Sequence, residues 1–163
     1  MKSIHLIRHA KSSWDNLATS DFYRDLNERG LRDAPMMAEK LKQSGCDPEY
    51  ILCSPAKRTT KTAEIVAKKL NFSQNCINFE QRIYEATLKT ILDVLNEIPN
   101  HFNQVVLIGH NPAITQLSNY LTNDYIDNIP TCGIVKIEMD IDDWQHIVEG
   151  IGRKLFFIYP KMF

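Results

Sequence analysis

Three short apolar runs constrain the fold of this chain more than any other feature of its sequence. They span residues 4–7, 50–53 and 105–108, and each passes directly into polar groups that suit a bound phosphate. Those groups are Arg8-His9, Ser54-Pro55-Ala56-Lys57-Arg58 and Gly109-His110-Asn111-Pro112. In an open α/β sheet, ligands bind in the crevice beyond the carboxyl ends of the strands. If the three runs are strands of one sheet, their polar groups should meet at one edge of it.

Apolar residues recur at helical spacing between and after the three runs, which predicts alternating strands and helices. The expected buried stripes are Leu31, Ala34, Ala38 and Leu41, then Ala63, Val66, Ala67 and Leu70, then Leu88, Ile91, Leu92, Leu95 and Ile98, and finally Ile114, Leu117 and Leu121. Ser54 is predicted to cap the second helix, with Pro55 at its first position. Asn111 is predicted to cap the last helix, with Pro112 at its first position.

After Pro130 the apolar period changes to two, which is typical of strands. Residues 135–139 and 144–148 are expected to form two strands joined by a turn at 140–143, and 155–159 is expected to form a final strand. The predicted fold class is α/β. It is a three-layer sandwich with a mostly parallel central sheet, helices on both faces and antiparallel strands near the C-terminus.

The composition predicts one globular domain, residues 1–163, with no nucleic-acid or membrane partner. A net charge of −1 gives no bulk electrostatic attraction to nucleic acid or to an anionic membrane. No stretch approaches the ~20 apolar residues of a membrane span. His5 and Arg8 interrupt the first apolar run, so no signal peptide is expected.

The four cysteines are expected to be reduced, in keeping with a cytoplasmic location. Cys46, Cys53, Cys76 and Cys132 are widely spaced and form no C-x-x-C motif or Cys/His metal spacing. Cys53 adjoins the polar group after the second run. As the last residue of an apolar strand, it is expected in the core rather than as a nucleophile.

Two arginines and two histidines stand among the polar groups of the predicted sheet edge. His9 is a capable nucleophile toward phosphorus, and the fork of Arg8 suits phosphoryl oxygens. Arg58 is expected in the first turn of a helix, where free N–H groups favour an anion. Taken singly, these residues and His110 also fit an exposed loop, a surface arginine or a core histidine. Their joint position at strand ends indicates a phosphoryl-transfer site that uses no metal.

The polar groups also carry a family resemblance. Leu6-Ile7-Arg8-His9-Ala10, Ser54-Pro55-Ala56-Lys57-Arg58-Thr59 and Gly109-His110-Asn111-Pro112 resemble the histidine phosphatase (phosphoglycerate mutase-like) superfamily. Within it, Arg-His-Ala-Lys-Ser-Ser-Trp, the element Leu26-Asn27-Glu28-Arg29-Gly30 and the short length resemble the SixA-type phosphohistidine phosphatases. The resemblance implies that His9 becomes transiently phosphorylated, within a cationic pocket of Arg8, Arg58 and His110. It further implies a phosphohistidine-bearing protein substrate and no cofactor.

Near His9 the chain departs from the family pattern. Ala10 replaces the usual glycine, and Asp15 stands where many relatives carry asparagine. An acid there would oppose phosphate binding, so Asp15 is expected to point away from the pocket. Ser12 is a candidate hydroxyl donor to phosphate. Lys11 is expected either to touch the substrate or to be solvated.

The general acid is the assignment that the sequence defines least. The superfamily takes it from the loop after the third strand, and aligning on Tyr84 puts Gln81 at its usual position. Glu85 and Glu80 are the remaining candidates, each with the alternative of an ordinary solvated carboxylate. A missing acid suits phosphohistidine, because its P–N bond can release neutral imidazole once the other ring nitrogen is protonated.

Three other functions compete with that of a phosphohistidine phosphatase. A phosphatase of small phosphorylated metabolites is disfavoured because no long insertion is present to form a lid. A non-catalytic phosphopeptide-binding protein would not need an unbound imidazole nucleophile. A metal site of His9 and His110 lacks suitably spaced Asp or Glu ligands. The acidic turn at 140–143 is no calcium loop, because Ile151 stands where the later Glu is required.

Overall fold

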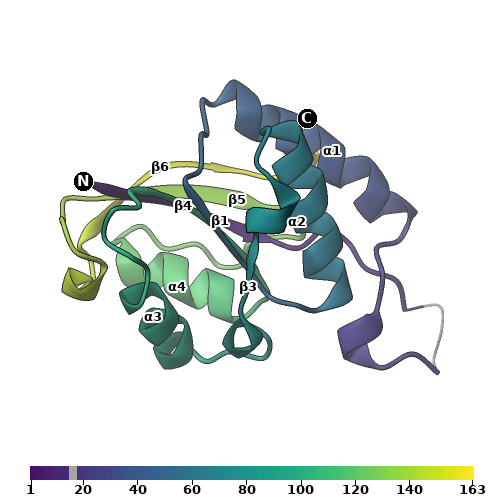
Figure 1. The fold of residues 1–163 in the computed structure, drawn as a ribbon. Helices are drawn as coiled ribbons and strands as arrows, with labels where there is room; N and C mark the ends of the chain where they lie inside the picture. The colour runs from purple at the N-terminus through teal and green to yellow at the C-terminus, as the bar shows by residue number, and fades with distance from the viewer. Residues whose placement is uncertain (15–17) are drawn as a thin grey trace.

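In the computed structural model, which describes residues 1–14 and 18–163, six strands form one sheet in the order β3-β2-β4-β1-β5-β6 (Figure 1). The strands are β1 (Lys2–Arg8), β2 (Tyr50–Cys53), β3 (Asn78–Phe79), β4 (Gln104–Gly109), β5 (Ile134–Met139) and β6 (Gly152–Ile158). The α-helices are α1 (Glu28–Gln43), α2 (Lys57–Lys69), α3 (Leu88–Asn96) and α4 (Ala113–Leu121).

The half of the sheet that carries the polar strand ends is parallel. β2 pairs with β3 and β4, and β4 pairs with β1, in a register that sets Arg8 beside Gly109 and Cys53 beside Ile108. β5 and β6 extend the sheet as antiparallel strands. The predicted α/β class, with antiparallel strands near the C-terminus, is therefore confirmed.

Helices cover both faces of the sheet. α1 and α2 pack on one face, and α3 and α4 pack on the other (Figure 1). Successive strand residues point to opposite faces, so Leu6 joins the core under α3 and α4, whereas Ile7 joins the core under α1 and α2. This two-sided burial explains why the parallel strands read as continuous apolar runs.

The start of α1 packs tightly against the loop that follows β1. Asn27 caps the helix, its side chain accepting from the backbone N–H of Gly30 (2.9 Å). A Cβ added at Gly30 would lie 2.2 Å from the carbonyl oxygen of Lys11, so only glycine fits this close approach. A bridge between Ser12 and Leu26 continues the contact. The helix thereby fixes the chain just beyond the end of β1.

Both proline-based predictions of a helix start are wrong by one or more residues. α2 begins at Lys57 after Ala56, with no side-chain cap. Ser54 is too far upstream to cap it, and its hydroxyl instead accepts from the N–H of Ala56 (3.3 Å).

α4 begins at Ala113, so Pro112 is the cap residue rather than the first helical residue. The Asn111 side chain still accepts from the backbone of that first turn (3.3 Å to the nitrogen of Thr115).

The predicted strand at 144–148 is also wrong. Trp144–His146 form a 3-10 helix, and the antiparallel partner of β5 is β6. Trp144 is fully buried and its indole N–H donates to the carbonyl of Phe102 (2.9 Å). An apolar residue was therefore placed where the alternating pattern of a strand would have one.

The exposure of α1 and the length of the helices are the remaining features of the fold. Leu31, predicted to be buried, is 52% exposed. No helix of the described residues is long and apolar enough to cross a membrane.

Candidate active site

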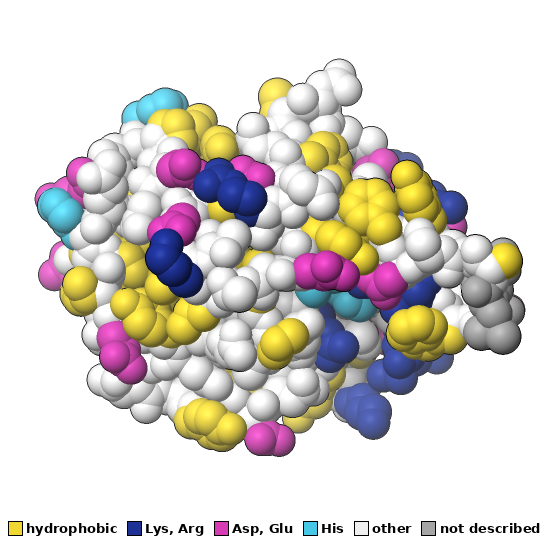
Figure 2. Space-filling model, turned by 90° about the horizontal axis from the view of Figure 1, so that it is seen from below, with side chains coloured by type: hydrophobic (Ala, Val, Ile, Leu, Met, Phe, Trp, Pro, Cys, Tyr) yellow, Lys and Arg dark blue, Asp and Glu magenta, His cyan; other side chains and the backbone are white. Residues whose placement is uncertain are grey.

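The ends of β1 and β4 open onto a cavity of about 220 Å³, called the strand-end cavity below. It is lined by Arg8, His9, Lys11, Ser12, Trp14, Arg24, Arg58, His110, Asn111 and Thr131. In Figure 2, histidine side chains lie in a hollow beside a group of Lys and Arg side chains. The structure thus brings together the four residues that the sequence placed at one sheet edge. None of the described residues that line the cavity is an acid.

Main-chain hydrogen bonds hold His9 where β1 ends. Its backbone N–H donates to the carbonyl of Gly109 (3.1 Å), which ties the residue to β4. The N–H of Cys132 lies 3.0 Å from the carbonyl oxygens of both Arg8 and His9 and donates to them. The N–H of Ala10 donates to the Thr62 hydroxyl of α2 (3.0 Å). The nucleophile candidate therefore stands on the rigid part of the fold.

One ring nitrogen of His9 is left for chemistry. Nδ1 lies 2.8 Å from the carbonyl oxygen of Ala10. Because a carbonyl only accepts, Nδ1 carries the proton and Nε2 keeps its lone pair. Burial lowers the pKa of His9 to about 3; the bond to Ala10 opposes this shift, and the nearby positive groups add to it. The ring is therefore neutral near pH 7, the form in which an imidazole can attack phosphorus.

His110 faces His9, with the ring centroids 5.2 Å apart. Its Nε2 lies 2.8 Å from the hydroxyl oxygen of Ser54, while its buried Nδ1 has no hydrogen-bond partner among the described residues. Burial and the positive charge of Arg58 lower the pKa of His110 to about 4. A bound phosphoryl group would reverse that electrostatic balance and favour the protonated, donating form.

The two predicted arginines reach the cavity from different elements. Arg8 ends β1, and its Nη1 donates to the carbonyl of Ile129 (3.0 Å), while its buried Nε has no partner among the described residues. Arg58 lies in the first turn of α2 and is largely buried. Burial, followed by the charge of Arg58, lowers the pKa of Arg8 from its usual value. Two guanidinium groups held close enough to repel one another form a site suited to an anion.

The loop after β1 supplies two further lining residues, Lys11 and Ser12. Lys11 was predicted either to touch substrate or to be solvated, and the structure places it in the lining of the cavity. The Ser12 hydroxyl accepts from Nη2 of Arg24 and keeps its own hydrogen to donate. Asp15, expected to point away from the pocket, lies outside the described residues.

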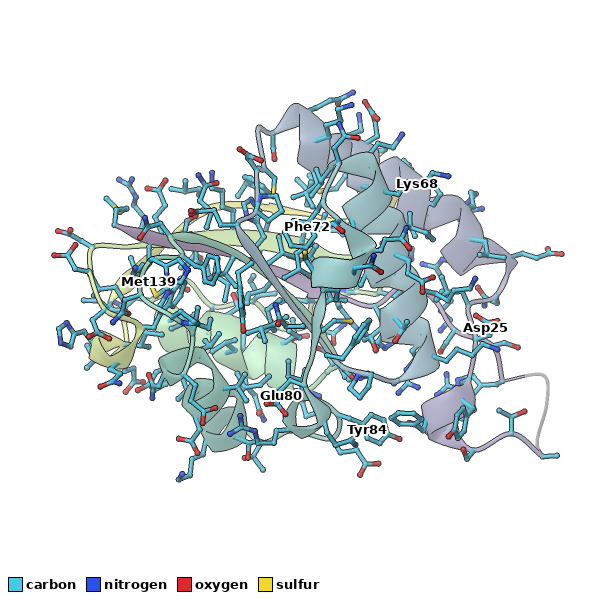
Figure 3. All side chains as sticks on the ribbon, in the orientation of Figure 1. Asp25, Lys68, Phe72, Glu80, Tyr84 and Met139 are labelled. Carbon is cyan, nitrogen blue, oxygen red and sulfur yellow. The ribbon has the colours of Figure 1, made fainter. Side chains whose placement is uncertain are left out.

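Neither glutamate considered as a general acid is among the described residues that line the cavity. Glu80 caps a 3-10 helix and forms an ion pair with Arg82 (2.7 Å), and hydrogen bonds from Arg82 lower its pKa. Figure 3 shows Glu80 beside α3. Glu85 and Gln81 are exposed to solvent. An ionised, paired carboxylate such as Glu80 is poorly suited to donate a proton.

Sequence reasoning missed several residues of the site. Arg24 lines the cavity, and Asp21 bonds to Arg58 (3.0 Å). Tyr84 donates to Asp21 (2.7 Å) and lies edge-on to His110, with ring centroids 5.6 Å apart. Asp21 and Arg24 follow an irregular stretch that has neither helical nor strand period, so no pattern pointed to them. Ser54 was assigned to a helix cap, although its hydroxyl lies beside His110.

The cysteines and potential metal ligands add no further chemistry to the cavity. All four cysteines are free, and burial raises the pKa of the Cys53 thiol, which disfavours its thiolate. Cys53 is fully buried, as predicted for a core residue. Within residues 1–14 and 18–163, no group of three or more His, Cys, Asp and Glu side chains is placed to hold a metal ion.

Known proteins resemble this chain in sequence and in fold. An uncharacterized protein of Mycobacterium leprae is 27% identical, over 95% of this chain and 100% of its own length. Phosphoserine phosphatase 1 of Hydrogenobacter thermophilus is 29% identical, over 68% of this chain and 53% of its own length. The structure of the protein histidine phosphatase SixA complexed with tungstate has the same fold, with a TM-score of 0.84 over 98% of both chains at 22% identity.

The family match covers the parts of the chain that carry the first two motifs. The model of the histidine phosphatase superfamily (branch 1) matches residues 4–88, from β1 to the start of α3, including Arg8, His9 and Arg58. His110 follows the end of β4, outside the matched range, yet its ring faces His9 in the cavity. The chain therefore belongs to the histidine phosphatase superfamily.

Proposed function

We propose that this protein is a metal-independent phosphatase that removes the phosphoryl group from protein phosphohistidine through a phosphorylated His9. The observation that carries the proposal is the 2.8 Å contact between Nδ1 of His9 and the Ala10 carbonyl. It leaves Nε2 of a neutral ring as a nucleophile inside a cationic cavity. A non-catalytic phosphopeptide-binding protein would have no use for this arrangement.

In the first step, Nε2 of His9 attacks phosphorus as the P–N bond of the substrate breaks. The substrate imidazole leaves as a neutral ring, because its other nitrogen is protonated. Phosphoryl transfer passes through a loose transition state, so positioning and positive charge supply most of the catalysis. Nε of Arg8 and Nδ1 of His110 are buried without a described protein partner, and phosphoryl oxygens would pair with them.

In the second step, a water molecule attacks the phosphorus of phosphorylated His9. The P–N bond breaks, its electron pair returns to Nε2, and the water oxygen and both of its protons leave with inorganic phosphate. Throughout both steps, Nδ1 of His9 keeps its proton and donates it in a hydrogen bond to the Ala10 carbonyl. Arg8, Arg58 and Lys11 hold the same phosphoryl group in each transition state.

The choice of phosphohistidine over an ester rests on proton supply. An alkoxide leaving group needs a proton from a nearby acid, whereas a protonated imidazole leaves without one. The described lining of the cavity contains no carboxylate, and Glu80 is ion-paired elsewhere. A cytoplasmic location is part of the proposal, since four free cysteines fit a reducing compartment.

A phosphatase of small phosphate esters is the second candidate. It is favoured by the similarity to a phosphoserine phosphatase. The alkoxide leaving group of such an ester would need a proton donor, and Tyr84 is poorly suited to that role, because its hydroxyl already donates to Asp21 and its pKa is raised to about 12. The two candidates make opposite predictions about which leaving group is preferred.

A substrate panel tests the proposal. We expect kcat/KM to be highest for protein phosphohistidine, intermediate for an activated aryl phosphate and lowest for phosphoserine or a sugar phosphate. All rates should be the same in EDTA, because the charge of the cavity comes from arginine, lysine and histidine. A phosphate ester that is hydrolysed faster than phosphohistidine would establish the second candidate. Activity that is lost in EDTA and restored by zinc or magnesium would contradict the metal-independent mechanism.

A further inference from the structure

The loop between β1 and α1 contributes an acid that contacts two arginines of the cavity. The η1 segment, residues 18–25, contains the 3-10 helix η1 (Asp21–Tyr23). Asp21 Oδ2 accepts from Nη2 of Arg58 (3.0 Å), and Oδ1 accepts from Nη1 of Arg24 (2.8 Å). Its backbone carbonyl accepts from Nη1 of Arg58 (2.7 Å). A single residue therefore joins an arginine of α2 to an arginine of its own loop.

Arg24 is fixed by hydrogen bonds and by contact with an aromatic ring. Its Nε donates to the carbonyl of Ser13 (3.0 Å), Nη2 donates to the Ser12 hydroxyl, and the guanidinium lies 3.2 Å from the centre of the Trp14 ring. These contacts fix a long side chain whose freedom would otherwise be costly to lose on binding. Arg24 also lines the strand-end cavity beside Arg58. Two guanidinium groups that are both hydrogen-bonded to Asp21 thus line one small cavity.

Asp21 is hydrogen-bonded to both arginines but is not itself among the described residues that line the cavity. Its contacts use one hydrogen on each terminal nitrogen of Arg58 and one on Nη1 of Arg24, so each guanidinium keeps N–H groups for a phosphate. Burial raises the pKa of Asp21, but hydrogen bonds from Tyr84, Arg24 and Arg58 outweigh it and hold the pKa far below the usual range. The carboxylate is therefore charged at every pH of interest.

We infer that Asp21 is a positioning residue that holds Arg58 and Arg24 as a fixed pair, and that Arg24 is a third arginine ligand of the phosphoryl group. The inference rests on the proposed function only in taking the cavity as the phosphoryl site. Tyr84 donates a further hydrogen bond to the same carboxylate, and its ring packs against those of Phe22 and His110. Figure 3 shows Tyr84 directed toward the η1 segment.

The direction in which phosphate affinity changes when Asp21 is replaced separates a positioning role from simple electrostatic repulsion. Removing a negative charge near an anion site should strengthen anion binding, and so should removing an acid that competes with phosphate for Arg58. Loss of a positioning carboxylate has the opposite sign, because the arginines lose their fixed geometry. The matched control is Asp25→Asn. Asp25, labelled in Figure 3, lies in the same segment but pairs with Lys57 (3.3 Å), which is not among the described residues that line the cavity.

The experiment measures the binding of inorganic phosphate and vanadate by calorimetry, together with kcat and KM. We expect Asp21→Asn to weaken phosphate binding by roughly tenfold, the scale for losing a charge-assisted hydrogen bond. It should lower kcat more than it raises KM, while Asp25→Asn binds as well as wild type or slightly better. Arg24→Lys, which keeps the charge but loses the fork, should also bind phosphate more weakly. The effects of Asp21→Asn and Arg24→Lys should not add in the double variant.

The possible outcomes distinguish the two proposals. Equal or tighter phosphate binding by Asp21→Asn, beside a wild type that binds normally, would overturn the positioning role alone. A wild type that binds neither phosphate nor vanadate would overturn the phosphoryl site itself. If Asp21→Asn unfolds, as judged by circular dichroism, the decision passes to Arg24→Lys and its double variant with Tyr84→Phe. Arg24→Lys with wild-type affinity would then contradict the inference.

Discussion

The strand ends and the η1 segment meet in one cavity, but different forces hold them. At the strand ends, main-chain hydrogen bonds between β1 and β4 fix His9, and they depend on no side chain. In the η1 segment, Arg24 is fixed by bonds that include two side chains, Asp21 and Ser12. The nucleophile is thus placed by the fold itself, whereas part of the anion-binding shell depends on a few exchangeable residues. Substitutions should therefore affect chemistry and anion binding separately.

The largest effect is expected at the strand end itself. His9→Ala should abolish turnover. Among the described residues at the strand ends, His9 is the histidine whose Nδ1 donates to a backbone carbonyl, which leaves Nε2 unprotonated and able to attack. His9→Asn should also be inactive, yet it should keep the fold and still bind phosphate or vanadate. Rapid quenching of wild type with labelled substrate should trap acid-labile label on His9. Turnover that persists in His9→Ala would move the chemistry away from the strand end.

The arginine and histidine that flank the nucleophile should come next. Arg58→Ala and His110→Ala should each reduce kcat/KM by roughly 10²–10³, the scale for removing one transition-state donor. Both should also bind phosphate more weakly. Lys57→Ala is the matched control, since Lys57 adjoins Arg58 in sequence but pairs with Asp25. If Lys57→Ala reduced kcat/KM as much as Arg58→Ala, or if Arg58→Ala left kcat/KM unchanged, the general charge of the region rather than the position of Arg58 would govern the site.

A smaller effect should appear in the pH dependence of stability. His110 has a pKa of about 4 in the folded protein and about 6.5 when unfolded, so the unfolded chain binds more protons below pH 6.5. The free energy of unfolding should therefore fall as the pH drops from 7 to 4.5. In His110→Asn this fall should be smaller by roughly 2 kcal/mol. Urea titrations at the two pH values measure it.

Phosphate gives an internal control for that measurement. Bound phosphate favours the protonated imidazole, so saturating phosphate should lessen the fall in wild type. It should not do so in His110→Asn. An identical effect of phosphate on both proteins would place the anion away from His110.

The smallest effects are expected in the loop after β3, which belongs to neither region. Glu80→Gln and Glu85→Gln should change phosphohistidine hydrolysis by less than about twofold, because exposed or ion-paired carboxylates contribute little. The same variants should be compared on an alkyl phosphate. A large loss in one of them on either substrate would identify a general acid that reaches the cavity during turnover.

The parts of the fold that follow a period could be predicted from the sequence. The parallel strands are buried on both faces and read as continuous apolar runs, so the ends of β1 and β4 were located, with Arg8, His9 and His110 beside them. Two-residue alternation predicted β5, because Lys136 and Glu138 on one face of that strand are less buried than Val135, Ile137 and Met139 on the other. It failed at Trp144, where a single buried indole in a 3-10 helix produced the same alternation.

The parts of the site that depend on long-range side-chain contacts could not be predicted. Asp21 and Arg58 are 37 residues apart, and Asp21 and Tyr84 are 63 residues apart. Nothing in the local sequence of the η1 segment distinguishes Asp21 from Asp25, which pairs with a lysine outside the cavity. Only the folded arrangement of the loop against α2 decides which of the two acids meets an arginine.

The partner of Nδ1 in His9 is a backbone carbonyl, and this has a consequence for how the site tolerates mutation. Where a carboxylate orients a histidine, a single codon change can delete the orienting group, and its titration ties the nucleophile to pH. The carbonyl of residue 10 is present whatever amino acid is encoded there, and it does not titrate. The attacking nitrogen is therefore specified by the path of the main chain, so genetic drift at position 10 can alter the space around the nucleophile without removing the group that orients it.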